Sequence, residues 1–153
     1  ADIFLEPLLR GLAKSGRTLA DIDVQVGGSL EIDDDVERLI EARRPAMAFT
    51  LGGMGSAKTN FYNDAFKRAG YAEAAEAVQA LWVSGDKAAA IRAVPDEMVL
   101  KTNLIGTREM IVERIKAYAA AGVTTLRIST SGRNWRERTE TIAEATDLIH
   151  SIQ

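Results

Sequence analysis

The sequence predicts an α/β fold that is rich in helix and forms only part of a larger architecture. Segments with helical spacing alternate with short β-branched segments, and the strand-like segments are too few for a complete doubly wound sheet. Strands separated by helices pair in parallel, and parallel sheets are normally covered on both faces or closed into a ring. Because the chain also begins with Ala1 rather than Met, we expect a piece of a longer polypeptide whose other strands lie elsewhere.

The first elements are a helix and a strand. Leucines at helical spacing predict a helix over residues 4–16, where a glycine suits the C-terminus. Residues 22–26 alternate apolar and polar side chains, which predicts a half-buried strand that can continue to Ile32. Gly27 and Gly28 indicate either a bulge or the close approach of another backbone.

A long helical stretch follows the first strand. Asp33–Asp35 predict a helix start, because aspartate is a preferred N-cap, and Pro45 is expected to interrupt this helix. The apolar run Pro45–Leu51 is ambiguous between helix and strand. Glycine, serine, aspartate and proline residues then bound further predicted helices at 59–70, 72–83, 87–94 and 96–100.

The last third of the chain predicts strand, helix, strand and helix. Leu104-Ile105 reads as a very short buried strand, and Thr107 as the N-cap of a helix that ends at Gly122. Residues 123–129 have the strongest strand pattern, in which Arg127 faces away from the apolar side. The final predicted helix runs to the C-terminus.

The amino-acid composition of the chain argues against several classes of function. The chain has 153 residues, of which 46% are hydrophobic and 27% charged, as in soluble globular proteins. A formal net charge of -3 argues against nucleic acid as a main partner. With no cysteine and one histidine, His150, neither a thiolate nor a multi-histidine metal site is expected, and we predict no metal. No apolar run is long enough to span a membrane.

One glycine-rich segment nearly matches a phosphate-binding loop. Gly52-Gly-Met-Gly-Ser-Ala-Lys-Thr59 resembles G-x-x-x-x-G-K-[ST], in which Lys58 would contact phosphates and Thr59 a magnesium ion. Ala57 replaces the second glycine, and its methyl group opposes the backbone conformation that the loop requires. The alternative interpretation is a glycine-rich connection with an exposed lysine.

Two further segments follow predicted strands, where ligands bind in parallel α/β folds. Gly106 and Thr107 begin a helix, whose free N–H groups can bind an anion; the alternative is a plain N-cap. Arg133 and Arg136 could hold an anion and Trp135 could stack on a planar ring, unless the segment is only a solvated loop.

Several segments together resemble the C-terminal half of the luciferase-like monooxygenase family, and most closely its coenzyme F420-dependent oxidoreductases. The resemblance covers nearly the whole chain. It is carried, in this order and spacing, by Phe4–Arg17, Leu51–Gly55, Asn60–Asn63, Val94–Glu97, Leu104–Thr107 and Ala121–Arg127.

The resemblance implies a fold and a position in it. The family fold is a (β/α)8 barrel, with the cofactor at the C-terminal ends of the strands. Residues 1–153 would be a single domain and the C-terminal half of that barrel. The strands near Ile22, Leu104 and Val123 would be the sixth, seventh and eighth, with a helical insertion before the seventh.

The resemblance also implies a function. The parent protein would transfer a hydride between coenzyme F420, a deazaflavin, and a small organic substrate, with an FMN-dependent monooxygenase as the alternative. The expected cofactor-binding residues are Gly52, Gly53, Gly55, Lys58, Gly106, Thr107 and Arg133. The expected substrate-binding residues are Asn60, Tyr62 and Trp135, and no catalytic residue is assigned.

The expected partners are a small-molecule substrate and either the missing N-terminal half of the barrel or a second copy of the chain. The family implies a cytoplasmic protein that is inactive without that half. A P-loop-like nucleotide-binding protein and a non-catalytic assembly module, joined through exposed strand edges, remain the alternatives.

Overall fold

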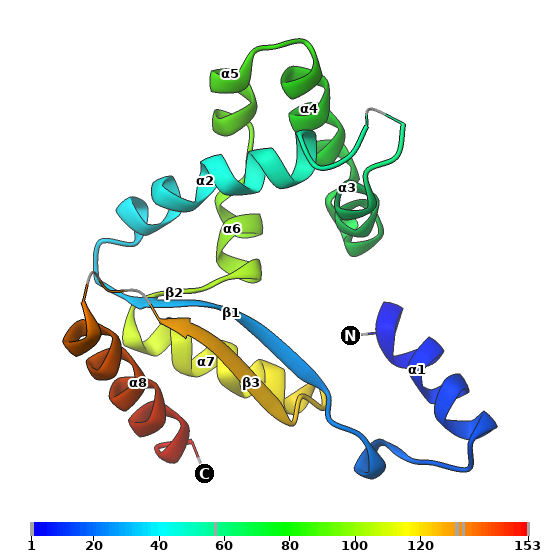
Figure 1. The fold of residues 1–153 in the computed structure, drawn as a ribbon, viewed down its shortest axis with the longest axis vertical. Coiled ribbons are helices and arrows are strands. Elements are labelled where there is room, and N and C mark those ends of the chain that lie inside the picture. Colours follow the sequence, from blue (N-terminus) through cyan, green and yellow to red (C-terminus); the bar gives the residue numbers. More distant parts are fainter. Residues whose placement is uncertain (1, 57, 131, 133, 153) are drawn as a thin grey trace. The chain divides into compact units, whose positions relative to one another are not determined.

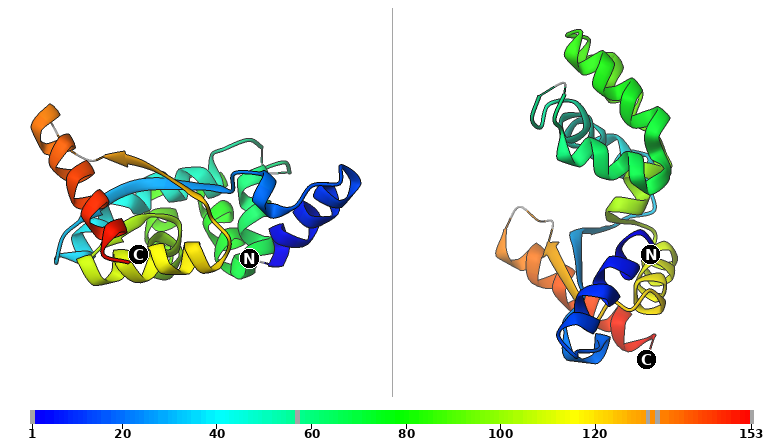
Figure 2. Two further views of the ribbon diagram at one scale, coloured as in Figure 1. Left: turned by 90° about the horizontal axis from the view of Figure 1, so that it is seen from below. Right: turned by 90° about the vertical axis from the view of Figure 1, so that its right-hand side faces the viewer.

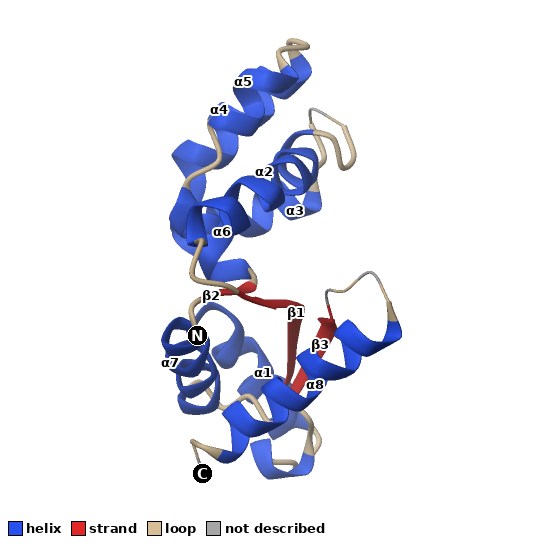
Figure 3. Ribbon diagram, turned by 90° about the vertical axis from the view of Figure 1, so that its left-hand side faces the viewer, coloured by secondary structure: helices blue, strands red, loops and turns tan. Residues whose placement is uncertain are grey.

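The computed structural model describes residues 2–56, 58–130, 132 and 134–152, and it divides into two compact units. The sheet unit contains Ala1–Asp34 and Asn103–Gln153, and the helical unit contains Asp35–Thr102. The described strands all belong to the sheet unit, and the helical unit consists of helices and loops (Figure 3). The prediction of a helix-rich α/β chain with a small parallel sheet is therefore confirmed.

The sheet unit is built around a three-stranded parallel sheet in the order β2-β1-β3. β3 runs beside β1 along its whole length (Figures 1 and 2). The elements of this unit are α1 (Asp2–Lys14), a 3-10 turn (Leu19–Asp21), β1 (Gln25–Ile32), β2 (Leu104–Gly106), α7 (Arg108–Ala120), β3 (Thr125–Thr130) and α8 (Trp135–His150).

The first strand begins later than predicted. Residues 22–24 lie outside β1, because the chain before them turns through a 3-10 segment that Thr18 and Asp21 cap reciprocally. The predicted extension to Ile32 is confirmed. Gly27 is a point of close backbone approach and not a bulge, since the register from Gln25↔Thr125 to Leu30↔Thr130 is continuous.

The strand order differs from that of consecutive barrel strands. In a (β/α)8 barrel each strand adjoins the next one along the chain, so β2 would lie between β1 and β3. Here β1 lies in the middle, so the pairing within this chain does not follow the expected sixth–seventh–eighth order. β2 has only three residues, whereas β1 offers β3 six residues in register and thereby satisfies more of its backbone groups.

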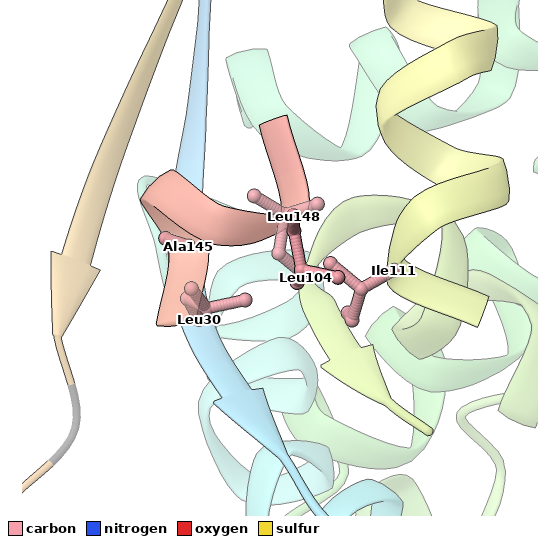
Figure 4. Close-up of a cluster of buried hydrophobic side chains, with 5 residues drawn as sticks. All are labelled: Leu30, Leu104, Ile111, Ala145 and Leu148. Atoms are coloured by element: carbon pink, nitrogen blue, oxygen red, sulfur yellow. The ribbon is translucent and has the colours of Figure 1, made fainter. Parts of the chain in front are cut away.

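One face of the sheet carries the core of this unit. Side chains from β1, β2, α7 and α8 form a buried cluster (Figure 4), which consists of Leu30, Leu104, Ile111, Ala145 and Leu148. Leu126 and Ile128 of β3 pack against this cluster, while Arg127 is exposed on the opposite face together with Gln25 and Gly27. The predicted alternation along β3 is confirmed.

The helical unit packs short helices around α2 (Val36–Gly52). The others are α3 (Phe61–Phe66), a π-helical turn (Lys67–Tyr71), α4 (Ala72–Val83), α5 (Lys87–Arg92) and α6 (Asp96–Thr102). Its fully or nearly fully buried side chains are apolar, apart from Asn60 and Asn63, and include Leu39, Ala48, Leu51, Ala75, Val78, Val94, Met98 and Val99.

Pro45 does not interrupt α2, so that prediction was wrong. The helix starts at the N-cap Asp35, as predicted, but continues through Pro45 to Gly52. Proline removes one backbone donor from a helix interior. Burial of Leu39, Met47 and Leu51 on both sides of the proline keeps the helix continuous. The ambiguous run 45–51 is therefore helical.

Candidate functional site at the carboxyl edge of the sheet

The carboxyl ends of the strands meet at one edge of the sheet. Ile32 is level with Gly106, and Leu30 is level with Thr130. The N–H of Asp33 donates to the carbonyl of Gly106 at 3.0 Å, which extends this pairing one residue beyond β1. Ligands of parallel α/β folds bind at this edge. We therefore treat it as the candidate site.

Gly106 and Thr107 connect β2 to α7 at this edge. Gly106 has a φ of +134°, a backbone conformation that residues with a Cβ atom rarely adopt, so a substitution there would be strained. The Thr107 hydroxyl caps α7 by accepting from the Met110 N–H at 3.4 Å, as predicted. It also donates to a carboxylate oxygen of Glu109 at 2.8 Å.

Glu109 places a negative charge in the first turn of α7. A hydrogen bond from its own backbone N–H and another from Thr107 hold the pKa of this carboxyl below its ordinary value. Helix N-termini favour negative charge because of their free N–H groups and the helix dipole. A ligand anion at Gly106 and Thr107 would therefore compete with Glu109.

The connection from β3 to α8 forms the other side of the edge. Asn134 caps α8 by accepting from the Glu137 N–H at 3.0 Å, and Arg138 Nε donates to the carbonyl of Gly132 at 3.1 Å. Trp135 is 74% exposed, and the guanidinium carbon of Arg136 lies 5.7 Å from its ring centroid. This leaves the indole ring accessible. Arg133 lies outside the described residues.

The glycine-rich segment lies in the helical unit, and packing explains its glycines. A Cβ atom on Gly52 would overlap the side chain of Trp82, and one on Gly53 would lie 2.6 Å from the ring of Phe49. Gly55 has a φ of +96° and approaches the carbonyl of Thr59. These glycines let α2 pack closely against α4 and let the chain turn.

The nucleotide-binding interpretation of this segment lacks its structural context. A phosphate-binding loop connects a strand to a helix, whereas this segment follows the helix α2. Ser56 and Thr59 bond each other through their backbones, and their hydroxyl oxygens lie 2.7 Å apart. Lys58 is exposed. Ala57, the departure from the motif, lies outside the described residues.

Asn60 and Tyr62, the expected substrate-binding residues, have different environments. Asn60 is 3% exposed: its amide donates to the carbonyl of Leu51 at 2.9 Å, and its oxygen accepts from the Asn63 N–H. The side chain of Asn60 therefore holds α3 to the end of α2. Tyr62 is exposed and stacks edge-on with Phe61 at 5.7 Å, which leaves it free to contact a ligand.

The structure places only some of the expected cofactor- and substrate-binding residues at the carboxyl edge of the sheet. Gly106, Thr107 and Trp135 lie at the carboxyl edge of the sheet, while Gly52, Gly53, Gly55, Lys58, Asn60 and Tyr62 belong to the helical unit. Sequence reasoning missed Glu109, and it named Asn63 only as part of the family segment Asn60–Asn63, without a role. An acidic residue two positions after an N-cap threonine could have pointed to Glu109. No local signal marks Asn63, whose partners lie twelve residues away on either side.

No group of three or more His, Cys, Asp or Glu residues in the described ranges could hold a metal ion. Within the same ranges, no helix is long and apolar enough to cross a membrane.

A family model described as "Luciferase-like monooxygenase" matches residues 3–125. This range extends from α1 through the helical unit and α7 to the first residue of β3. The chain belongs to the luciferase-like monooxygenase family. The resemblance inferred from the sequence is thus confirmed for most of the chain.

The relatives of this family member include proteins named for coenzyme F420. The chain is 32% identical over 126 residues to a Mycobacterium tuberculosis protein named as a coenzyme F420-dependent oxidoreductase, covering 81% of the chain and 36% of that protein. It is 28% identical over 123 residues to a 5,10-methylenetetrahydromethanopterin reductase of Archaeoglobus fulgidus, covering 80% of the chain and 36% of the reductase. The chain therefore spans about a third of the length of these relatives.

A solved structure shares the fold of this family member. The coenzyme F420-dependent tetrahydromethanopterin reductase from Methanopyrus kandleri matches with a TM-score of 0.69 at 24% identity. The match covers 99% of this chain and 42% of that chain. It supports the α/β fold and indicates that the related protein has a large part with no counterpart here.

Proposed function

We propose that this chain is the C-terminal part of an F420-dependent oxidoreductase, which transfers a hydride to or from a small organic substrate. The observation that carries the proposal is the match of four-fifths of the chain to a relative named for that coenzyme. In this proposal residues 1–153 form one domain, the closing part of a (β/α)8 barrel. The helical unit is its insertion, and β1, β2 and β3 are strands of that closing part, with β1 between β2 and β3.

The proposed binding residues at the carboxyl edge follow from their position after the strands. The backbone of Gly106 and Thr107 contacts the coenzyme, and the exposed ring of Trp135 contacts the substrate. Arg133, outside the described residues, is proposed for the coenzyme from the sequence alone. From the insertion, Lys58 contributes to the coenzyme site and Tyr62 to the substrate site. Gly52, Gly53, Gly55 and Asn60 hold that segment in shape through the contacts described above.

In this proposal the coenzyme and the protein contribute different parts of the reaction. The bound coenzyme supplies the hydride chemistry, while the protein binds it, orients it and excludes water. A chain that contributes one sheet edge and an insertion provides only part of such a site. We therefore propose that the chain alone is inactive and acts with the rest of the barrel.

Titration calorimetry with the coenzyme tests the proposal. Oxidised and reduced coenzyme F420 are added to the chain alone, and to the chain mixed with the Mycobacterium tuberculosis relative lacking its matched region. We expect saturable binding only in the mixture, weakened by Lys58→Ala and unchanged by Arg92→Gln, an exposed residue of α5.

Two results would contradict the proposal. Tight binding and oxidation of the reduced coenzyme by the chain alone would overturn its dependence on another part. Tighter binding of FMN than of coenzyme F420 by the mixture would overturn the choice of cofactor and favour an FMN-dependent monooxygenase.

A further inference from the structure

The two faces of the sheet carry different kinds of side chain. Leu30, Leu126 and Ile128 lie on the face that α7 and α8 cover, and the strands lie in front of α7 in Figure 1. Because side chains alternate along a strand, the residues between these share the opposite face. This polar face consists of Gln25, Gly27, Ser29, Glu31, Thr125, Arg127 and Ser129. Parallel strands that are buried under apolar layers on both faces are apolar nearly throughout, so the polar face suits a polar surrounding.

Arg127 extends toward β1 on the polar face. It is level with Gly27, and its Nε atom lies 3.3 Å from the position that a Cβ atom on residue 27 would occupy. Gly27 therefore leaves the space in which the side chain of Arg127 lies. Arg127 is exposed, and the described residues give its guanidinium neither a hydrogen bond nor an ion pair. It is thus a positive charge that the described part of the chain does not neutralise.

The neighbours of Arg127 on the polar face are small. The next residues toward the carboxyl edge are Ser29 and Ser129, which pair in register. The interior of a (β/α)8 barrel is usually filled by valine, isoleucine and leucine. Glycine and two serines in their place leave room along the sheet from Arg127 to its carboxyl edge, and the serine hydroxyls can bond to a polar group there.

We propose that Arg127 binds an anionic group of the small organic substrate, which therefore carries a carboxylate or a phosphate. This inference rests on the proposed function, because it takes the chain to be part of a closed barrel. Helices cover the outside of such a barrel, so the face opposite α7 and α8 is its interior. A guanidinium enclosed there needs an anion to offset its lost hydration, and its forked donors fit the oxygens of carboxylate and phosphate.

The alternative partner of Arg127 is a carboxylate from the remaining part of the barrel. The room beside Arg127 favours a ligand over this ion pair. It leads past Ser29 and Ser129 to the edge where Gly106 and Trp135 lie, and ligands bind parallel α/β folds at this edge. An ion pair within the protein needs no such passage, and large side chains would close around it as in other protein interiors.

Nuclear magnetic resonance of the Arg127 Nε–H group tests the proposal. The isotope-labelled chain is mixed with the Mycobacterium tuberculosis relative lacking its matched region, and coenzyme F420 is added to saturation so that the coenzyme site is filled. Acetate and inorganic phosphate are then titrated separately, which distinguishes a carboxylate site from a phosphate site. The Arg127 signal is identified by its absence in Arg127→Gln. The internal control is the signal of Arg92, an exposed residue of α5.

We expect the Arg127 signal of the mixture to shift saturably with one of the two anions, at a concentration at least about tenfold lower than the Arg92 signal needs. By calorimetry, Arg127→Lys should weaken anion binding and Arg127→Gln should abolish it, while both variants bind coenzyme F420 like the wild type. In the chain alone, Arg127 and Arg92 should respond alike, because water then surrounds both.

Each other outcome overturns the inference. If the mixture binds the coenzyme but its Arg127 signal responds no better than that of Arg92, Arg127 does not hold the substrate, and the proposed function still stands. If the Arg127 signal moves when the coenzyme is added and then ignores both anions, or if Arg127→Gln loses coenzyme binding, Arg127 belongs to the coenzyme site instead. If the mixture binds no coenzyme, the proposed function and the inference fail together.

Discussion

The main-chain carbonyl oxygen of Arg127 lies 2.5 Å from the position that a Cβ atom on residue 27 would occupy. Real Cβ atoms do not approach other atoms so closely, and the neighbour here is backbone, which cannot easily move. Cβ and Nε of Arg127 also lie within 3.3 Å of the same position. Glycine at position 27 is therefore a condition for the pairing of β3 with β1.

We predict that Gly27→Ala destabilises the sheet unit by about 1–3 kcal/mol, because the methyl group forces the two strands apart. Urea unfolding measures the free energy. The matched control is Gly11→Ala in α1, where a Cβ atom meets nothing within 4 Å and alanine should stabilise by about 0.5–1 kcal/mol. Equal effects of the two changes would contradict the steric explanation.

Asn63 ties three helices of the helical unit together. Its amide donates to the carbonyls of Leu51 at 2.9 Å and Ala75 at 2.8 Å, and its side chain is almost fully buried. We predict that Asn63→Ala costs about 1–3 kcal/mol, since both buried carbonyls lose a donor. Chemical unfolding followed by circular dichroism checks this. Asp64→Asn, which alters the exposed neighbour, should change stability little.

Arg44 connects α2 to the start of α6. Its guanidinium pairs with Glu41 and Asp96, donates to the carbonyl of Val94, and is 13% exposed. Burial lowers its pKa, but the carboxylates of Glu41 and Asp96 outweigh this and raise the pKa above its ordinary value. We predict that Arg44→Met lowers the stability of the helical unit by about 1–3 kcal/mol.

Arg44→Lys should recover only part of the loss, because an ammonium group cannot reproduce the forked geometry of arginine. Thermal unfolding of the wild type and the two variants checks this. We expect the unfolding temperature to fall from the wild type to Arg44→Lys and further to Arg44→Met. A methionine variant as stable as the wild type would show that the ion pairs contribute nothing net.

Glu109 should make stability depend on pH. Its pKa is lowered on folding by its own backbone N–H and by Thr107, so the ionised carboxylate stabilises the folded chain above pH 4.5, the ordinary value. This contribution is lost as the pH falls through the lower folded pKa. We predict that Glu109→Gln is less stable than wild type at pH 7, and that the difference vanishes at strongly acidic pH.

The matched control is Glu113→Gln, which changes an exposed carboxylate in the middle of the same helix, away from its N-terminus. Urea midpoints at pH 7 and pH 3 provide the measurement. A loss in Glu109→Gln that is the same at both pH values would show that its charge is not the cause.

Local signals explain what the sequence could predict. Asp35, Asp86 and Thr107 cap helices where their residue types suggest, because a cap depends on groups three residues away. Gly16 and Gly122 end helices with positive φ, as expected for glycine after a last turn. The alternation along β3 likewise depends only on neighbouring residues.

Long-range partners explain what the sequence could not predict. The strand order depends on whether β3 finds a better partner in β1 or in β2, which no local pattern encodes. Gly52 is required by Trp82, thirty positions further along the chain, and Pro45 is tolerated because residues around it are buried by other helices. Gly106, Thr107 and Trp135 lie beyond the carboxyl ends of the strands, as their sequence positions predict, whereas the sequence did not point to Glu109 beside them.

The packing of Gly52 against Trp82 has a consequence for reading related sequences. A substitution of Ala57 by glycine would complete the phosphate-loop consensus, yet the preceding segment would still be helix α2, and Gly52 and Gly53 would still pack against Trp82. Homologues that spell out the full consensus here would look like ATPases to a pattern search. A large aromatic residue about thirty positions downstream would indicate that these glycines serve helix packing, as Gly52 does against Trp82 here.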